Sequence, residues 1–100
     1  MKATPLVSRR VSVAESVFVE IVLWLLPEPS KGSRHSYKYR LALVADGICV
    51  ARYDNEAGKG DHKHIGDREL PYRFSDVDTL ISDFYADVGA WLDENRRIQH

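Results

Sequence analysis

The chain has 100 residues, of which 44% are hydrophobic and 29% charged, and its formal net charge at pH 7 is −1. This length and composition predict one folded globular domain over residues 1–100 and exclude a disordered chain. The small net charge excludes a general attraction of the protein to nucleic acid, so any contact with RNA must come from a local basic patch.

The N-terminal part of the chain predicts neither a secretory signal nor a membrane helix. Met1–Val11 carries charges and has no apolar core. Val17–Leu26 is the longest apolar run, is interrupted by Glu20, and has about half of the ~20 residues that a membrane helix needs. Cys49 is the single cysteine, which excludes a disulfide within the chain and predicts a small buried residue. We therefore expect a cytoplasmic protein that does not contact a membrane.

Two β-hairpins are predicted in the first half of the chain. Their strands are Val7–Val13 with Val17–Leu25, and Tyr37–Ala45 with Ile48–Asn55. The second pair flanks Asp46-Gly47, a strong signal for a two-residue hairpin turn. Such a turn places Ala45 opposite Ile48, and uninterrupted pairing then places Arg40 opposite Tyr53. The expected register therefore gathers Lys38, Arg40 and Tyr53 at one end of a sheet face.

The strand within Val17–Leu26 is apolar on both faces apart from Glu20. An antiparallel strand with one solvated face alternates apolar and polar residues, and this one does not. A single helix covers one face of a small sheet, so the other face is expected to leave apolar side chains exposed. We therefore expect Trp24 or its neighbours to contact a second protein chain.

The second half of the chain predicts a polar segment followed by one long helix. Asp54–Asp67 is polar and punctuated by glycine, and His62–Ile65 is a candidate fifth strand. From Ser75 onward the apolar residues recur every three or four positions, and Ser75 with Asp78 forms a capping-box pattern. The apolar positions are Val77, Leu80, Ile81, Phe84, Val88, Trp91 and Leu92. The acidic positions of the helix, Asp76, Asp83, Asp87 and Asp93, are expected to form a solvated face.

Together these elements predict an α+β fold: an antiparallel sheet of four or five strands with one long C-terminal helix packed on one face.

The densest group of chemically active side chains lies between Tyr53 and His64. His62 and His64 point to the same side of a strand and can supply a general base and a general acid. Arg40, Lys59 and Lys63 could stabilise charge on a phosphate. Asp54 or Asp61 could orient a histidine, and Tyr53 could stack on or bond to the substrate. Asp54, Asp61 and Tyr53 complete the candidate cluster.

Two other interpretations of this segment stay open. The histidines are incidental if the segment is simply a solvated hairpin loop. Alternatively, His62 and His64 bind a metal, with Asp61, Asp67 or His35 as a third ligand.

The segment Lys31–Arg40 carries four fixed positive charges and two tyrosines, and contains no acid. Basic residues interleaved with aromatic ones suit single-stranded RNA, because cations hold phosphates and rings stack on bases. In the expected register Lys38 and Arg40 belong to the candidate site, whereas Tyr39 is expected in the core.

Several stretches of the sequence resemble the TumE family, which are toxins of type II toxin–antitoxin modules. The stretches are Tyr37–Gly47, Tyr53–His64, Pro71–Phe74, the first hairpin ending in Leu26-Pro27-Glu28-Pro29, and the helix at Leu80–Val88. The resemblance covers nearly the whole chain and implies a toxin role and a cognate antitoxin as partner. Family members tend to have glycine in the first hairpin turn, where this chain has Ala14-Glu15-Ser16; the difference affects the turn type.

The leading hypothesis is a metal-independent endoribonuclease toxin that needs no cofactor. Its expected partners are RNA and an antitoxin. The protein forms a homodimer if the exposed apolar strand pairs with a copy of itself. Its expected catalytic residues are His62, His64, Arg40, Lys59 and Asp61, and its expected substrate-binding residues are Lys38, Tyr53, Asp54 and Lys63. The alternatives are a toxin that blocks a protein or ribosomal target by binding, and a group-transfer toxin suggested by the turn Gly58-Lys59-Gly60, which no nucleotide-binding fingerprint accompanies.

Overall fold

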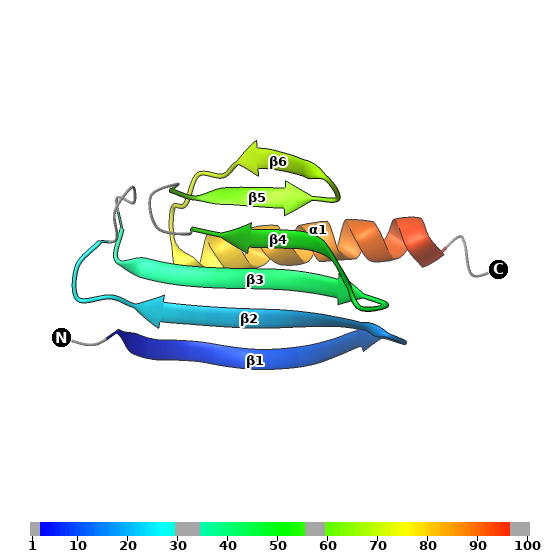
Figure 1. Ribbon diagram of the computed structural model, residues 1–100, viewed down its shortest axis with the longest axis horizontal. Coiled ribbons are helices and arrows are strands. Elements are labelled where there is room, and N and C mark those ends of the chain that lie inside the picture. Colours follow the sequence, from blue (N-terminus) through cyan, green and yellow to red (C-terminus); the bar gives the residue numbers. More distant parts are fainter. Residues whose placement is uncertain (1–2, 30–34, 56–59, 97–100) are drawn as a thin grey trace.

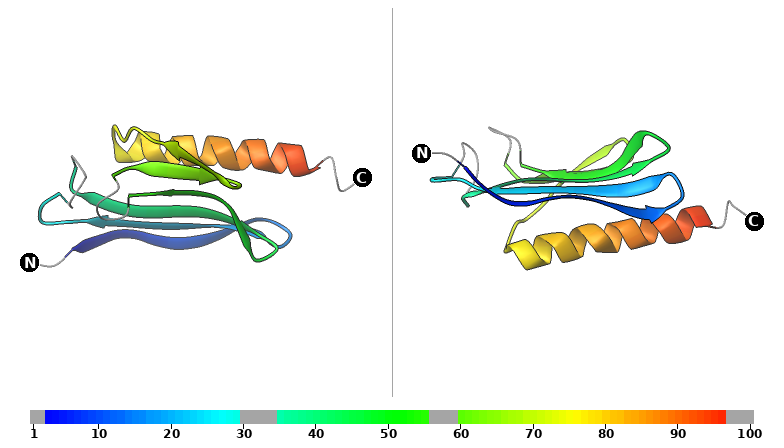
Figure 2. Two further views of the ribbon diagram at one scale, coloured as in Figure 1. Left: turned by 45° about the horizontal axis from the view of Figure 1, so that its top comes forward. Right: turned by 90° about the horizontal axis from the view of Figure 1, so that it is seen from below.

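The computed structural model describes residues 3–29, 35–55 and 60–96, which form one antiparallel sheet and one helix (Figure 1). The strands pair in chain order, so each neighbours the next along the sequence. They are β1 Thr4–Ala14, β2 Val17–Leu25, β3 Tyr37–Ala45, β4 Ile48–Asp54, β5 His62–Ile65 and β6 Arg68–Pro71. The helix α1, Val77–Arg96, lies across one face of the sheet (Figure 2).

The predicted fold class is confirmed, with six strands in place of four or five. The additional strand, β6, pairs with β5 across a turn in which Gly66 has a φ of 62°. Its sequence, Arg-Glu-Leu-Pro, has no β-branched or aromatic residue, so propensity does not mark it as a strand. Pairing with β5 forms it, and Pro71 is tolerated because β6 is the edge of the sheet.

The predicted register of the second hairpin holds only next to the turn. Asp46 and Gly47 have φ angles of 51° and 79°, as a two-residue hairpin turn requires, and Ala45 pairs with Ile48. Beyond the turn a β-bulge adds one residue to β4, so Leu43 pairs with Ala51 rather than Val50.

The bulge reverses the faces predicted for the rest of β4, since successive side chains of a strand point to opposite sides. Arg40 pairs with Asp54, and Tyr53 pairs with Leu41. The prediction that Tyr53 joins Lys38 and Arg40 is therefore wrong, and Asp54 takes its place beside Arg40.

The hydrophobic core lies between the sheet and α1. Its fully buried side chains include Val19, Leu41, Leu43, Leu80 and Phe84. Partly buried side chains packed against this core come from both ends of the helix, Val77 and Ile81 at one end and Trp91 and Leu92 at the other. The helical periodicity read from the sequence therefore marks the face of α1 that packs on the sheet.

The N-cap of the helix lies one residue later than predicted. Asp76, rather than Ser75, accepts a hydrogen bond from the backbone N–H of Thr79 at 2.7 Å. This bond lowers the pKa of the Asp76 carboxyl, since it favours the charged form. Asp76 is therefore the N-cap, and Val77 is the first helical residue.

Cys49 is exposed, which corrects its prediction as a buried residue. It pairs with Val44 next to the hairpin turn. Among the described residues, none form a helix whose length and hydropathy would suit a transmembrane segment.

Candidate functional site

The face of the sheet opposite α1, called the open face here, carries two rows of side chains from all six strands. One row is Ser8, Val22, Arg40, Asp54, His62 and Pro71; the next is Arg10, Glu20, Ala42, Arg52, His64 and Glu69. Polar and ionisable groups dominate the β3–β6 end of both rows. The β3–β6 end of the open face therefore carries two imidazoles, two carboxylates and two guanidinium groups.

Asp54 and His62 form the centre of this group. Asp54 is 2% exposed and His62 is 6% exposed, and Asp54 Oδ1 lies 2.7 Å from His62 Nε2. Arg52 Nε lies 2.7 Å from Asp54 Oδ2. Neither contact has hydrogen-bond geometry, so within the described residues each Asp54 oxygen has a nitrogen close to it but no aligned hydrogen-bond donor.

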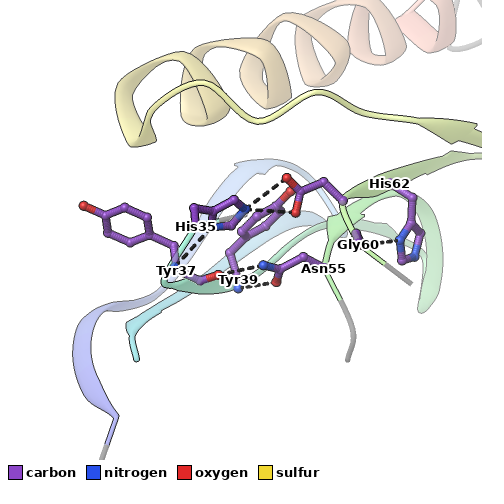
Figure 3. Close-up of polar contacts among 7 residues, drawn as sticks. His35, Tyr37, Tyr39, Asn55, Gly60 and His62 are labelled. Atoms are coloured by element: carbon purple, nitrogen blue, oxygen red, sulfur yellow. Dashed lines mark hydrogen bonds and ion pairs between the residues drawn. The ribbon is translucent and has the colours of Figure 1, made fainter. Parts of the chain in front are cut away.

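The two histidine rings of β5 lie on the same side of the strand, as the i, i+2 spacing predicts. Their centroids are 5.1 Å apart and their planes nearly perpendicular. His62 Nδ1 also lies 3.2 Å from the carbonyl oxygen of Gly60 (Figure 3). His62 is thus held from two sides, while His64 is half-buried and more accessible. The pair therefore consists of one fixed imidazole and one that can meet a ligand.

A cavity of about 380 Å³ opens on the same face, next to Asp54. Its lining includes Val22, Trp24, Lys38, Arg40, Asp54 and Asn55. Trp24 is 37% exposed, and Lys38 pairs with it across β2 and β3. The cavity thus combines an exposed indole, two cationic side chains and the carboxylate that contacts His62. This combination can receive a phosphate with an attached base.

Asn55 extends the pairing of β3 with β4 beyond the last residue of β4. Its side-chain Oδ1 accepts a hydrogen bond from the backbone N–H of Tyr39 at 3.0 Å, and its Nδ2 donates to the carbonyl of Tyr37 at 2.6 Å (Figure 3). The amide imitates a strand partner, and the residue is 2% exposed. Asn55 therefore fixes the end of β4 at which Asp54 lies.

His35 and Asp61 form a separate pair. His35 Nε2 lies 3.0 Å from both carboxylate oxygens of Asp61, and His35 Nδ1 accepts a hydrogen bond from the backbone N–H of Tyr37 at 3.1 Å (Figure 3). The imidazole also stacks on Phe74, with ring centroids 3.9 Å apart. Asp61 therefore contacts His35, whereas on the open face the histidine that contacts a buried carboxylate is His62, through Asp54.

Lys63 and Tyr53 meet on the opposite face, beneath α1. Lys63 Nζ lies 3.2 Å from Asp87 Oδ2 and 3.3 Å from the Tyr53 hydroxyl, which also donates to Asp87. Tyr72 donates to Asp83 at 2.7 Å. Asp83 and Asp87 therefore join the helix to the sheet, which corrects their prediction as part of a solvated face.

Three tyrosine hydroxyls are kept protonated by their surroundings. Burial raises the pKa of Tyr39, Tyr53 and Tyr72 well above the ordinary value, and neighbouring carboxylates raise it further. Tyr53 and Tyr72 donate to carboxylates of α1, and all three tyrosines are poor candidates for a general base.

On the open face, the hydrogen bond from Arg10 and the charge of Arg40 lower the pKa of Glu20.

The structure brings five of the predicted site residues together on the open face: His62, His64, Asp54, Arg40 and Lys38. It places Asp61, Tyr53 and Lys63 elsewhere, and Lys59 lies outside the described residues. Arg52, Glu69 and the position of Trp24 beside the cavity were not foreseen as parts of the site. Strand alternation from Asp54 would have indicated Arg52, whereas Glu69 depends on β6.

The comparisons agree with the resemblance seen in the sequence. The family described as Toxin TumE matches residues 3–92, which include all six strands and most of α1. Neither the curated proteins nor the solved structures contain a significant match. With nine-tenths of its length matched, this chain belongs to the TumE family of toxins.

Proposed function

We propose that this toxin is an endoribonuclease in which His62 and His64 exchange protons with the substrate without a metal ion. The observation that carries the proposal is the arrangement of the open face. Two imidazoles lie with ring centroids 5.1 Å apart, one contacts a buried carboxylate, and that carboxylate lines a cavity with two cations.

The reaction would begin with removal of the proton from a ribose 2′-hydroxyl by one imidazole. The 2′-oxygen attacks the adjacent phosphorus, the bond from phosphorus to the 5′-oxygen breaks, and the other imidazole gives that oxygen a proton. The products are a 2′,3′-cyclic phosphate and a free 5′-hydroxyl. Two neighbouring imidazoles suit this exchange because each changes protonation state readily near neutral pH.

The cavity suits the remaining demands of the reaction. Arg40 and Lys38 can balance the charge that develops on the phosphate, and the exposed Trp24 ring can stack on a base. The proposal gives Asp54, rather than Asp61, the task of orienting a histidine, because Asp54 contacts His62 directly. It leaves Tyr53 and Lys63 to hold the helix.

The test is RNA cleavage by His64→Ala and His62→Gln variants, measured with growth inhibition and thermal unfolding. Gln retains a donor for buried Asp54, whereas His62→Ala would leave that carboxylate without its partner. Loss of one general acid or base is expected to slow cleavage about 10²–10⁴-fold. Replacing the half-buried His64 with alanine is expected to shift the unfolding midpoint by only a few degrees, because such substitutions lower the free energy of unfolding by roughly 0.5 kcal/mol.

Two further results decide between this proposal and its rivals. Cleavage is expected to persist in excess EDTA; loss on chelation with recovery on adding zinc or manganese would replace acid–base catalysis with metal catalysis. A folded His64→Ala variant that remains fully toxic would favour a toxin that acts by binding its target.

We also propose that the cognate antitoxin covers the open face around Trp24. The indole is 37% exposed and neighbours the cavity, so a protein bound there would exclude RNA from the cavity. The same surface is the one through which two copies of the chain would associate if the protein is a homodimer.

A further inference from the structure

Three possible metal ligands meet at the β5–β6 end of the open face. His62, His64 and Glu69 each offer one ligand atom, and these atoms all lie within 4.8 Å of one another. The alternation of β5 puts both imidazoles on this face, and the pairing of β5 with β6 places Glu69 directly opposite His64. The cluster therefore arises from the pairing of two described strands of the sheet.

The spacing is close to that of a tetrahedral site. With Zn–N distances of about 2.0–2.1 Å, two ligands of a tetrahedral zinc ion are roughly 3.4 Å apart. The ligand atoms would need to approach by at most about 1.4 Å, which side-chain rotation can supply. Glu69 is exposed, so its carboxylate is free to move toward the histidines.

The surroundings of His62 favour a cation at this place. A neutral imidazole with its proton on Nδ1 can donate to Gly60, and a backbone carbonyl is a common partner for the second nitrogen of a metal-bound histidine. Nε2 is then the nitrogen left to act as a ligand, and Asp54 Oδ1 lies 2.7 Å from it. A carboxylate this close to the ligand nitrogen favours a cation near both, and within the described residues no hydrogen-bond donor is aligned with that oxygen.

We propose that His62, His64 and Glu69 bind a divalent ion of the zinc type, and that the bound ion inhibits RNA cleavage. Two histidines and one carboxylate are a ligand set that zinc accepts, with a fourth position left for water. The inhibition rests on the proposed function, because an ion bound to both imidazoles occupies the lone pair with which one accepts the substrate's proton and displaces the proton that the other must donate.

The binding test uses full-length untagged protein, zinc chloride and a chromogenic zinc chelator as competitor. The parent is expected to bind one zinc ion, and Glu69→Gln is expected to weaken binding at least tenfold. Asp67→Asn is the matched control: Asp67 lies in the turn of the same hairpin and outside the cluster, so this variant should bind zinc as the parent does. Equal affinity in the parent and Glu69→Gln, or no binding by the parent, would overturn the site.

The inhibition test measures RNA cleavage by the same proteins over a zinc titration. Zinc is expected to inhibit the parent and Asp67→Asn at similar concentrations, and to inhibit Glu69→Gln only at concentrations at least tenfold higher. Binding without inhibition would overturn the inhibitory role. Cleavage that requires zinc would also overturn it and would refute the metal-independent mechanism, while the binding data would still support the site.

Discussion

Replacing Asn55 with alanine tests whether this residue is structural. The substitution removes the acceptor of the Tyr39 N–H and the donor to the Tyr37 carbonyl, two bonds of 3.0 and 2.6 Å. A buried polar group left without a partner costs about 1–3 kcal/mol. The Tyr39 N–H lies in a buried residue and should incur most of that cost, whereas the half-buried Tyr37 carbonyl can be partly rehydrated. We therefore expect Asn55→Ala to lower the free energy of unfolding by about 2–4 kcal/mol.

Urea denaturation followed by circular dichroism measures this change, and a loss of about 2–4 kcal/mol corresponds to roughly 10–30 °C in the unfolding midpoint for a domain of this size. Asn95→Ala is the control, because Asn95 donates to the Trp91 carbonyl in the last turns of α1, where water can replace it. That variant should lose roughly 0.5 kcal/mol or less. The reasoning is refuted if Asn55→Ala is as stable as Asn95→Ala.

Three further predictions concern the open face. Replacing Lys38 and Arg40 with glutamine should weaken single-stranded RNA binding. It should also reduce the steepness of the log of the binding constant against the log of the salt concentration by about 1.4, or ~0.7 for each lost phosphate contact. An unchanged slope would mean that RNA binds elsewhere. The pKa of Glu20 is lowered in the folded protein, so its ion pairs add stability above pH 4.5, and this stability is lost as the pH falls through the folded pKa. Glu20→Gln should therefore lower the free energy of unfolding by up to ~1 kcal/mol at pH 7 and by much less at pH 3, as measured by urea titrations. Trp24→Glu should weaken association with the antitoxin or a second copy, measured by sedimentation, whereas Tyr85→Glu, at an exposed aromatic residue of α1, should not; equal association of both variants would contradict the predicted interface.

Local signals in the sequence were sufficient for most of the fold. Asp46-Gly47 specifies its turn because both residues tolerate positive φ, and the three-and-four spacing from Val77 to Leu92 specifies a helix with one apolar face. The alternation of His62 and His64 placed both imidazoles on the same side of a strand. Each of these features depends on residues within a few positions of one another, so no knowledge of the tertiary structure was needed.

The sequence left the site incomplete because one extra residue in β4 changes which side chains meet. Strand alternation has a period of two, so the bulge at Val50 turns Tyr53 toward the helix and Asp54 toward His62. No local pattern marks the bulge, and an uninterrupted register was the simpler expectation. The error moved a tyrosine into the predicted site and left open which carboxylate contacts His62.

Other parts of the site depend on contacts between segments that are distant in the sequence. Glu69 lies beside the histidines only because β6 pairs with β5. Asp61 contacts His35, which is 26 residues away in the sequence. Lys63 was grouped with the histidines as a neighbour in sequence, yet it points to the opposite face and reaches Asp87 of the helix. The sequence by itself determined which elements form and which side chains could react. Only the tertiary structure decided which of those side chains share a face, because that depends on register and on packing between distant strands and the helix.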